Sequence, residues 1–244
     1  MKLMKRLAAS VVVAFGCVAP LHAAVLLHAY DFSAGVVDSV GGQNGSLLNG
    51  ATTVGGALVL DGVNDYVQFA SSIVPTIGSM SVAFWAREDA RSGAFVEFIS
   101  QGSSGGPGFY IGHNPGGMVR VTDLAASTGV ATGALADWVH YVMTVDVAGS
   151  STHLFMDSVE VWSTSTAFQT GAGGTATRLG RQLGGFSEFF HGAMDDLAVY
   201  SGALSAAEVE SLYRGTASGV PEPGSLALAV LALLAMARVA RPRP

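Results

Sequence analysis

The sequence is poor in charged residues, and its few lysines all lie near the start. Charged residues make up 12% of the 244 residues, about half the usual share. Six of the twelve basic residues fall in the terminal segments: Lys2, Lys5, Arg6, Arg238, Arg241 and Arg243. The body between them therefore has six arginines, no lysine and 17 or 18 acidic residues, a net charge near −12. A surface of this sign repels phosphate backbones and anionic lipids, which disfavours nucleic-acid binding.

Cysteine is almost absent, and the single one, Cys17, lies in an N-terminal stretch with the features of a secretory signal peptide. A basic start precedes an apolar stretch from Leu7 to Val18, and small residues follow at Ala23. This stretch of about 12 residues is shorter than the roughly 20 that a membrane span needs. We expect a signal peptide over residues 1–23, cleavage at Ala23, export through the Sec translocon and a mature protein without disulfides. The alternative, a lipoprotein anchored through Cys17, lacks a good lipobox before the cysteine.

Long helical patterns are also missing from the body, which instead alternates apolar and polar residues between turns. Thirty-two glycines without a three-residue period exclude collagen and indicate many tight bends. The clearest alternation runs through Ser79–Arg87 and through Val139–Val147. Further strands are expected at Ala57–Leu60, Tyr66–Phe69, Phe95–Ser100, Phe109–Gly112, Met118–Thr122, His153–Met156 and Asp196–Tyr200. Many short strands at this spacing indicate a sandwich or barrel.

One helix is marked near the end of the body, within Leu204–Gly215. Ser205 and Glu208 have the spacing of a capping box, and Gly215 suits the position just after a helix. Its apolar face consists of Val209, Leu212 and Tyr213. We expect that face to pack on the sandwich.

Five motifs follow one another along the body. They are His28–Phe32, Asp38–Gly41, Gly56–Val67, Trp138–His140 and Gly192–Tyr200. In this order they resemble the LamG-like jelly-roll domains of the concanavalin A-like superfamily. The resemblance covers roughly Leu26 to Tyr213 and implies an all-β fold, an antiparallel jelly-roll β-sandwich with one short C-terminal helix, over residues 26–214.

One hairpin departs from the family pattern. Where the family usually has Asp-Gly after its Trp-x-His strand pair, this chain has Asp157-Ser158. Serine resists the positive φ that glycine accepts. We therefore expect a longer loop running toward Glu160 and Trp162 in place of a tight two-residue turn.

The superfamily includes glycoside hydrolases, which need two carboxyl groups flanking a cleft. The resemblance implies a strand reading Glu-x-Asp-x-x-Glu, and no segment has it. Asp195 and Asp196 are adjacent and so point to opposite faces of a strand. Glu97 and Glu160 have no carboxylate two residues on. The sequence therefore predicts no catalytic residue and no enzyme.

Calcium is a further implication of the resemblance, since many such sandwiches hold Ca²⁺ through carboxylates and loop carbonyls. The candidate ligands are Asp38, Asp61, Asn64, Asp65 and Asp195. The alternative is that these residues only form turns through local hydrogen bonds, because no calcium loop of fixed spacing is present.

Carbohydrate binding is the alternative to catalysis, and it favours exposed aromatic rings beside polar loops. Trp85 and Trp162 are the candidates, with the loops at 102–117 and 170–189. A tryptophan on a sandwich strand is also a common core residue, and that interpretation is preferred for Trp85.

The last segment, after a linker at 215–220, has three parts within residues 220–244. A motif of Pro221, Glu222 and Pro223 comes first, an apolar run from Leu226 to Ala237 second, and Arg238, Arg241 and Arg243 last. This resembles the PEP-CTERM sorting signal of Gram-negative bacteria that make exopolysaccharide. The resemblance implies a short transmembrane helix that holds the protein transiently in the inner membrane, and cleavage by an exosortase.

Together these features predict an exported, non-catalytic binding or adhesion module. Its place would be the cell surface or exopolysaccharide matrix, and its partner a carbohydrate or a surface protein. Two alternatives stay open: a structural matrix protein without a defined ligand, and a relative of the glycoside hydrolases.

Overall fold

The structure is a computed structural model of the chain, and it describes residues 24–102, 108–121, 126–168, 175–182 and 188–215. The strands are β1 (Val25–Tyr30), β2 (Gly45–Leu48), β3 (Thr52–Val54), β4 (Ala57–Asp61), β5 (Tyr66–Phe69), β6 (Met80–Glu88), β7 (Val96–Gly102), β8 (Gly108–His113), β9 (Met118–Val121), β10 (Ala126–Ala131), β11 (Trp138–Asp146), β12 (Ser151–Met156), β13 (Val159–Thr164), β14 (Thr175–Leu179) and β15 (His191–Ser201). The helix is α1 (Ala206–Tyr213). The signal peptide predicted at 1–23 and the sorting signal predicted at 220–244 lie outside the described residues.

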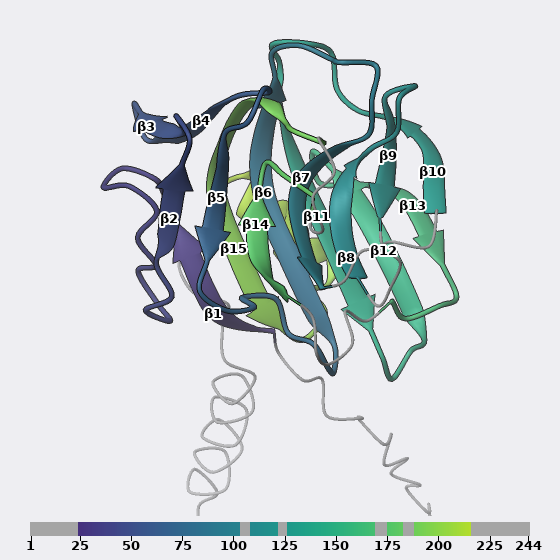
Figure 1. Cartoon of the computed structure of the whole chain (residues 1–244). Coiled ribbons are helices and arrows are strands. Elements are labelled where there is room, and N and C mark those ends of the chain that lie inside the picture. Colours follow the sequence, from purple (N-terminus) through teal and green to yellow (C-terminus); the bar gives the residue numbers. More distant parts are fainter. Residues whose placement is uncertain (1–23, 103–107, 122–125, 169–174, 183–187, 216–244) are drawn as a thin grey trace, which may run out of the picture.

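Two antiparallel sheets face each other, so the predicted all-β sandwich is confirmed (Figure 1). The eight-stranded sheet has the order β13-β12-β11-β6-β15-β4-β3, with β1 also paired to β15. The seven-stranded sheet has the order β10-β9-β8-β7-β14-β5-β2 and lies toward the viewer in Figure 1. No helix in the part of the chain that the structure describes is long and apolar enough to cross a bilayer.

The core lies between the sheets and follows from the alternation of side chains along each strand. Met80, Val82 and Phe84 of β6 are buried in it, as the sequence pattern predicts. Phe84 packs edge-on against Phe98 of the opposite sheet, with ring centroids 5.9 Å apart. Large apolar side chains from both sheets thus fill the interior and fix which residues of each strand point outward.

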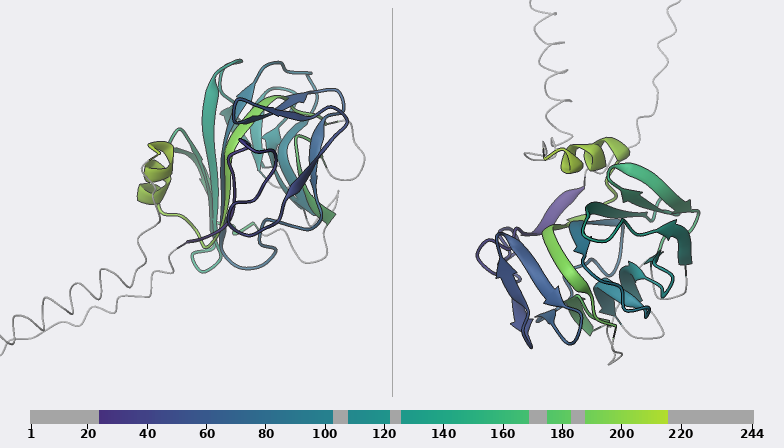
Figure 2. Two further views of the ribbon diagram at one scale, coloured as in Figure 1. Left: turned by 90° about the vertical axis from the view of Figure 1, so that its left-hand side faces the viewer. Right: turned by 90° about the horizontal axis from the view of Figure 1, so that it is seen from above.

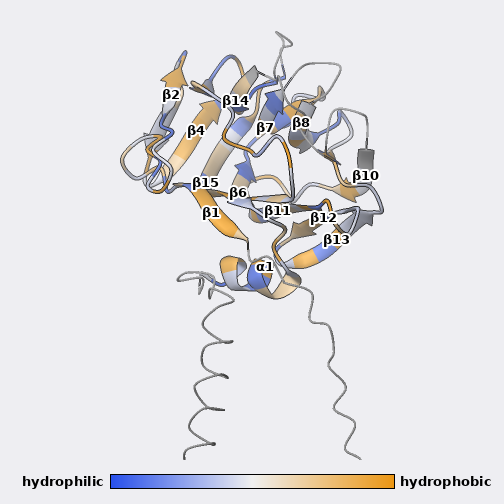
Figure 3. Ribbon diagram, turned by 90° about the horizontal axis from the view of Figure 1, so that it is seen from below, coloured by the Kyte–Doolittle hydropathy of each residue, from blue (hydrophilic) through white to orange (hydrophobic). Residues whose placement is uncertain are grey.

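Helix α1 covers the outer side of the eight-stranded sheet (Figures 2 and 3). Ser205 caps it, and the predicted capping box with Glu208 is present in both directions. Val209 is fully buried and packs in a small apolar cluster with Ala83 and Phe155 from the sheet. The part of the eight-stranded sheet beneath α1 is therefore buried on both faces.

The hairpin between β12 and β13 corrects one prediction. Asp157 and Ser158 form a tight two-residue turn, with φ of 48° and 68°, where the sequence predicted a longer loop. The strain is offset by hydrogen bonds, because the Asp157 carboxylate accepts from the His140 amide and its own amide donates to the His140 carbonyl, both at 2.9 Å. Aspartate tolerates the left-handed region better than most residues, and here its anchoring holds the serine as well.

Candidate functional site

The outer side of the seven-stranded sheet carries polar and aromatic side chains. In β9, Val119 and Val121 are buried in the core, and Arg120 between them points outward. The same alternation turns outward Tyr66, Gln68, Glu97, Tyr110 and Arg178. We call this surface the arginine–aromatic face and include in it the adjoining Phe95, Arg181, Glu188 and Phe189. Because the face joins residues from five strands and the segment before β15, no single stretch of sequence contains it.

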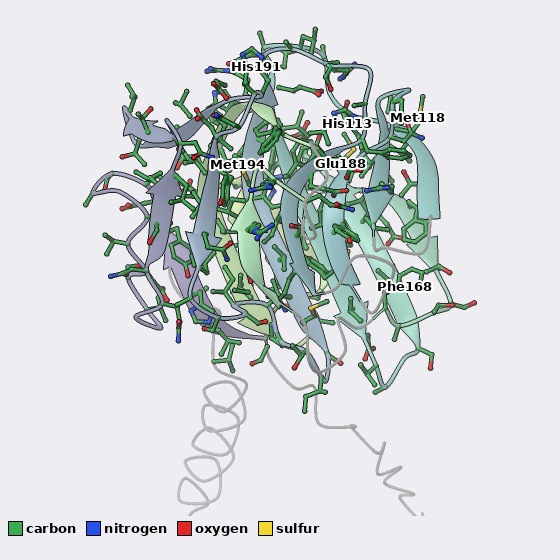
Figure 4. All side chains as sticks on the ribbon, viewed as in Figure 1. His113, Met118, Phe168, Glu188, His191 and Met194 are labelled. Atoms are coloured by element: carbon green, nitrogen blue, oxygen red, sulfur yellow. The ribbon has the colours of Figure 1, made fainter. Side chains whose placement is uncertain are left out.

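At one end of this face, Arg120 lies between two carboxyl groups. Its guanidinium donates to Oε1 of Glu97 and lies 3.8 Å from Oε2 of Glu188. The same guanidinium lies over the ring of Phe95, with 4.5 Å from Cζ to the centroid. Figure 4 labels Glu188 near β7 and β8. Arg120 of β9 thus contacts β7 through Glu97, the segment before β7 through Phe95, and the segment before β15 through Glu188.

Glu97 is fully buried at the bottom of this cluster. Burial, aided by the nearby Glu188 carboxyl and opposed by Arg120, raises the pKa of Glu97 to about 8. Glu97 is therefore protonated at neutral pH. Gly112 lies opposite Glu97 in the register, and a Cβ there would lie 2.5 Å from Oε2 of Glu97, so the glycine makes room for the carboxyl group.

At the other end of the face, two arginines flank the ring of Tyr66. The Cζ atoms of Arg178 and Arg181 lie 5.6 and 4.7 Å from its centroid. Gln68 orients Arg178, because its Oε1 accepts from Nε at 2.7 Å. Phe189 covers the other side of Arg181 at 5.2 Å. These half-buried side chains are held in fixed positions and keep part of their surface in contact with solvent.

The carboxyl pair of this face does not have the geometry of a glycosidase site. Glycosidases hold their two carboxyl groups about 5–5.5 or 6.5–9.5 Å apart, on either side of the sugar. Here the Arg120 guanidinium lies against both carboxyl groups, donating to Oε1 of Glu97 and lying 3.8 Å from Oε2 of Glu188. Glu97 also has no exposed surface on which a sugar could bind. The sequence missed this pair because the two residues are 91 positions apart in the numbering and meet only through the sheet.

Trp85, a candidate ligand-binding residue, lies on the opposite side of the molecule beneath α1. Its ring stacks on Tyr213 of the helix at 5.5 Å and lies 5.0 Å from the ring of His140. Burial lowers the pKa of His140 to about 4. A shallow groove of about 260 Å³ between α1 and the sheet is lined in part by Trp85, His140 and Asp196. The preferred interpretation of Trp85, a packing residue, agrees with this placement.

Trp162, the second candidate, lies on β13 and packs against the main core. Its ring is parallel to that of Phe168, with centroids 6.5 Å apart. Trp162 is opposite the core residue Leu154 in the register, and so it points to the inner side of the sheet that has Trp85 on its outer side. The two tryptophans do not form one binding surface.

Asp38, a proposed calcium ligand, is already used by its own loop. Its carboxylate accepts from the amides of Ala29, Val40, Gly41 and Gln43. Nδ1 of His28 lies 2.7 Å from Oδ2. Although burial opposes the effect, these hydrogen bonds hold the pKa of Asp38 well below its usual value. Asp38 organises the loop after β1.

The other proposed calcium ligands also have local roles. Oδ1 of Asp61 accepts from the amides that follow it in the β4–β5 turn. Asn64 accepts through its backbone carbonyl from Asn49, and Asp65 accepts from the Asp61 amide. Asp195 lies in β15, where burial raises its pKa to about 6. Within the described ranges no three His, Cys, Asp or Glu side chains form a group that could hold a metal ion.

Comparison with known proteins agrees with this architecture. Residues 61–210, more than half of the chain, match the family model described as the concanavalin A-like lectin/glucanases superfamily. The chain belongs to this superfamily. A search of curated proteins found no match.

Solved structures of the concanavalin A-like fold include several that resemble this chain. Domain 4 of AbnA, an extracellular arabinanase of Geobacillus stearothermophilus solved with arabinotriose, has a TM-score of 0.62 and 21% identity, over 78% of this chain and 98% of that domain. The binding domain of Paraclostridial Mosquitocidal Protein 1 has a TM-score of 0.58 and 14% identity, over 79% and 52%. Trypanosoma rangeli sialidase has a TM-score of 0.61 and 14% identity, over 77% and 32%. At these identities the likeness concerns the fold.

Proposed function

We propose that this protein is an exported, non-catalytic binding module whose arginine–aromatic face binds carbohydrate. The observation that carries the proposal is the fixed group of Tyr66, Phe189, Arg178 and Arg181 on one sheet face. Sugars present apolar ring faces and hydroxyl edges, which suit aromatic rings beside planar hydrogen-bond donors. The full burial of Glu97 supports binding over hydrolysis, since its carboxyl group has no exposed surface on which a sugar could bind.

Two of the structural neighbours are consistent with this proposal. One is an arabinanase domain solved with arabinotriose, and another is the binding domain of a toxin. Both use the same fold in an extracellular or binding context that their names state. They support a binding role here without specifying the sugar.

The terminal segments supply the proposed location. The features of residues 1–23 support export through the Sec translocon. The tripartite segment at 220–244 supports PEP-CTERM sorting, with exosortase cleavage near Pro221–Pro223 and transient retention in the inner membrane. The mature module would then reach the cell surface or exopolysaccharide matrix of a Gram-negative bacterium. Mass spectrometry of the exported protein tests this, and a C-terminus still ending at Pro244 would contradict it.

A glycan array with the full chain tests the binding proposal. We expect saturable binding to a defined set of glycans, weakened about tenfold by Tyr66→Ala because the ring platform is lost. Tyr213→Ala is the matched control, since this tyrosine lies on α1 at the opposite side of the molecule. The proposal fails if no glycan binds, or if the two variants lose affinity equally. Absence of any ligand would favour a structural matrix protein, and release of sugar from any polysaccharide would favour a hydrolase.

A further inference from the structure

Arg178 and Arg181 differ from the other arginines because neither forms an ion pair with a described acidic residue. The other four arginines of the described body face carboxylates: Arg87 with Asp89, Arg91 with Glu88, Arg120 with Glu188, and Arg214 with Glu210. Neither Arg178 nor Arg181 forms a salt bridge within the described ranges. Their partners among the described residues are neutral: Gln68, the Gln182 carbonyl and aromatic rings.

The two cations are also close to each other. Both guanidinium groups lie over Tyr66, and the charge of Arg181, after burial itself, lowers the pKa of Arg178. Placing two like charges together costs free energy that a bound anion would recover. The rest of the body has a large excess of acids, yet no acid in the part of the chain that the structure describes forms an ion pair with either arginine. The nearby Glu188 carboxylate is directed to Arg120.

Some N–H donors of Arg178 and Arg181 have no hydrogen-bond partner among the described residues. Nε of Arg181 is buried and has no hydrogen-bond partner among the described residues. Arg178 uses Nε and Nη1 for Gln68 and the Gln182 carbonyl, and its Nη2 has no hydrogen-bond partner among the described residues. A guanidinium group presents its N–H donors as a planar fork that matches the two oxygens of a carboxylate.

We propose that the Arg178–Arg181 pair binds the carboxylate of an acidic sugar, so that the ligand is a uronate-bearing polysaccharide. Tyr66 and Phe189 lie beside the pair and would contact the ring of the same sugar. This inference rests on the proposed function, since it assigns a chemical class to the ligand of the arginine–aromatic face. It explains why an acidic protein carries an unpaired cationic pair on one face.

The experiment compares acidic polysaccharides with their own neutral derivatives. Affinity electrophoresis of the full chain is run in gels with polygalacturonate, alginate or hyaluronan, and with each polymer after reduction of its carboxyl groups to alcohols. We expect at least one acidic polymer to bind, and reduction to weaken that binding about tenfold or more. Raising the salt concentration should weaken the acidic polymer selectively. Dextran sulfate is included to test whether the face prefers sulfate groups to carboxylates.

Variants separate this inference from the proposed function. Arg178→Gln and Arg181→Gln should each lose about tenfold or more in affinity for the acidic polymer and leave binding to its reduced form unchanged. Arg214→Gln, on α1, is the matched control and should bind as the unaltered chain does. Tyr66→Ala should weaken both forms. Melting temperatures show whether each variant is folded, and Arg181→Lys, which keeps the charge, provides a second variant should Arg181→Gln fail to fold.

The outcomes are distinguishable. Equal binding of the acidic and reduced polymers, or binding of neutral glycans alone, would overturn the carboxylate assignment and keep the carbohydrate function. Stronger binding of dextran sulfate than of every carboxylated polymer would also overturn it. Binding of no polymer would overturn both proposals.

Discussion

The two sheets of this sandwich have different outer faces. The eight-stranded sheet is covered by α1, and the side chains it presents there are apolar, among them Ala83, Val142 and Phe155. The seven-stranded sheet presents arginines, glutamates and aromatic rings. The difference shows that the two outer faces of one sandwich can be finished in different ways. A helix packs on one face, and the other face carries polar side chains, of which Glu97 is fully buried while Arg178 and Arg181 are partly exposed.

The largest expected effect comes from the covered face. Trp85→Ala removes the ring that stacks on Tyr213 and packs against His140, so it should lower the free energy of unfolding by about 3 kcal/mol. Urea unfolding measures the loss. If ligand binding belongs to the outer face of the seven-stranded sheet, the folded variant binds glycan as the unaltered chain does.

Trp162→Ala is the companion to this variant, because its ring packs against the core from the other side of the sheet. We expect it too to lose stability and keep ligand affinity. A selective loss of glycan binding in either folded variant would restore the tryptophans as ligand-binding residues and would contradict the division between the faces.

A second prediction concerns the buried acid of the arginine–aromatic face. The folded pKa of Glu97, about 8, lies above its ordinary value of 4.5. Between these values the folded state retains a proton that the unfolded state has released, so stability falls as pH rises, by up to about 1.4 kcal/mol per pH unit. Below pH 4.5 the Glu97 carboxyl group is protonated in both states, so its stabilising contribution is fully present and no longer changes with pH.

Glu97→Gln does not titrate, and it should therefore lack this part of the pH dependence. Urea unfolding of both proteins at pH 5.5, 6.5 and 7.5 gives the difference. Asp195, with a pKa of about 6, and His140, with a pKa of about 4, contribute to the pH dependence of both proteins and cancel in the difference. Parallel slopes for the two proteins would show that Glu97 is ionised in the folded state.

The smallest expected effect lies in the β12–β13 hairpin, far from the proposed ligand. Ser158 has a φ of 68°, which glycine adopts without a steric penalty. Ser158→Gly should raise the free energy of unfolding by about 0.5–1 kcal/mol and leave glycan affinity unchanged. A thermal melt measures the first quantity. A loss of stability would indicate that the serine makes a contribution beyond its backbone conformation.

Most of the fold follows from local patterns in the sequence. The strands around Ser79–Arg87 and Val139–Val147 were predicted from alternation and differ from β6 and β11 by about one residue at each end. Five strands lacked a clear pattern and were missed: β2, β3, β10, β13 and β14. They are short, exposed or glycine-containing, and pairing with a neighbouring strand stabilises them more than their own sequence does.

The candidate site was much harder to predict. The sequence pointed to Trp85 and Trp162 because tryptophan is common in carbohydrate sites. In the structure Trp85 packs against α1 and Trp162 packs against the core. The only feature of the sequence that could have indicated Arg178 and Arg181 is their spacing, three positions apart in a chain with few arginines. Their position over Tyr66 depends on the pairing of β14 with β5, which joins residues more than a hundred positions apart.

The sequence alone determined the class of fold, the capped helix and the acidic character of the body, because alternation, capping and charge are local properties. The tertiary structure decided which face α1 covers, that Asp157 and Ser158 turn tightly, and that Arg120 lies against both Glu97 and Glu188. These outcomes depend on the register of strands far apart in the chain. Register is set by the summed burial of the core, which no short stretch of sequence contains.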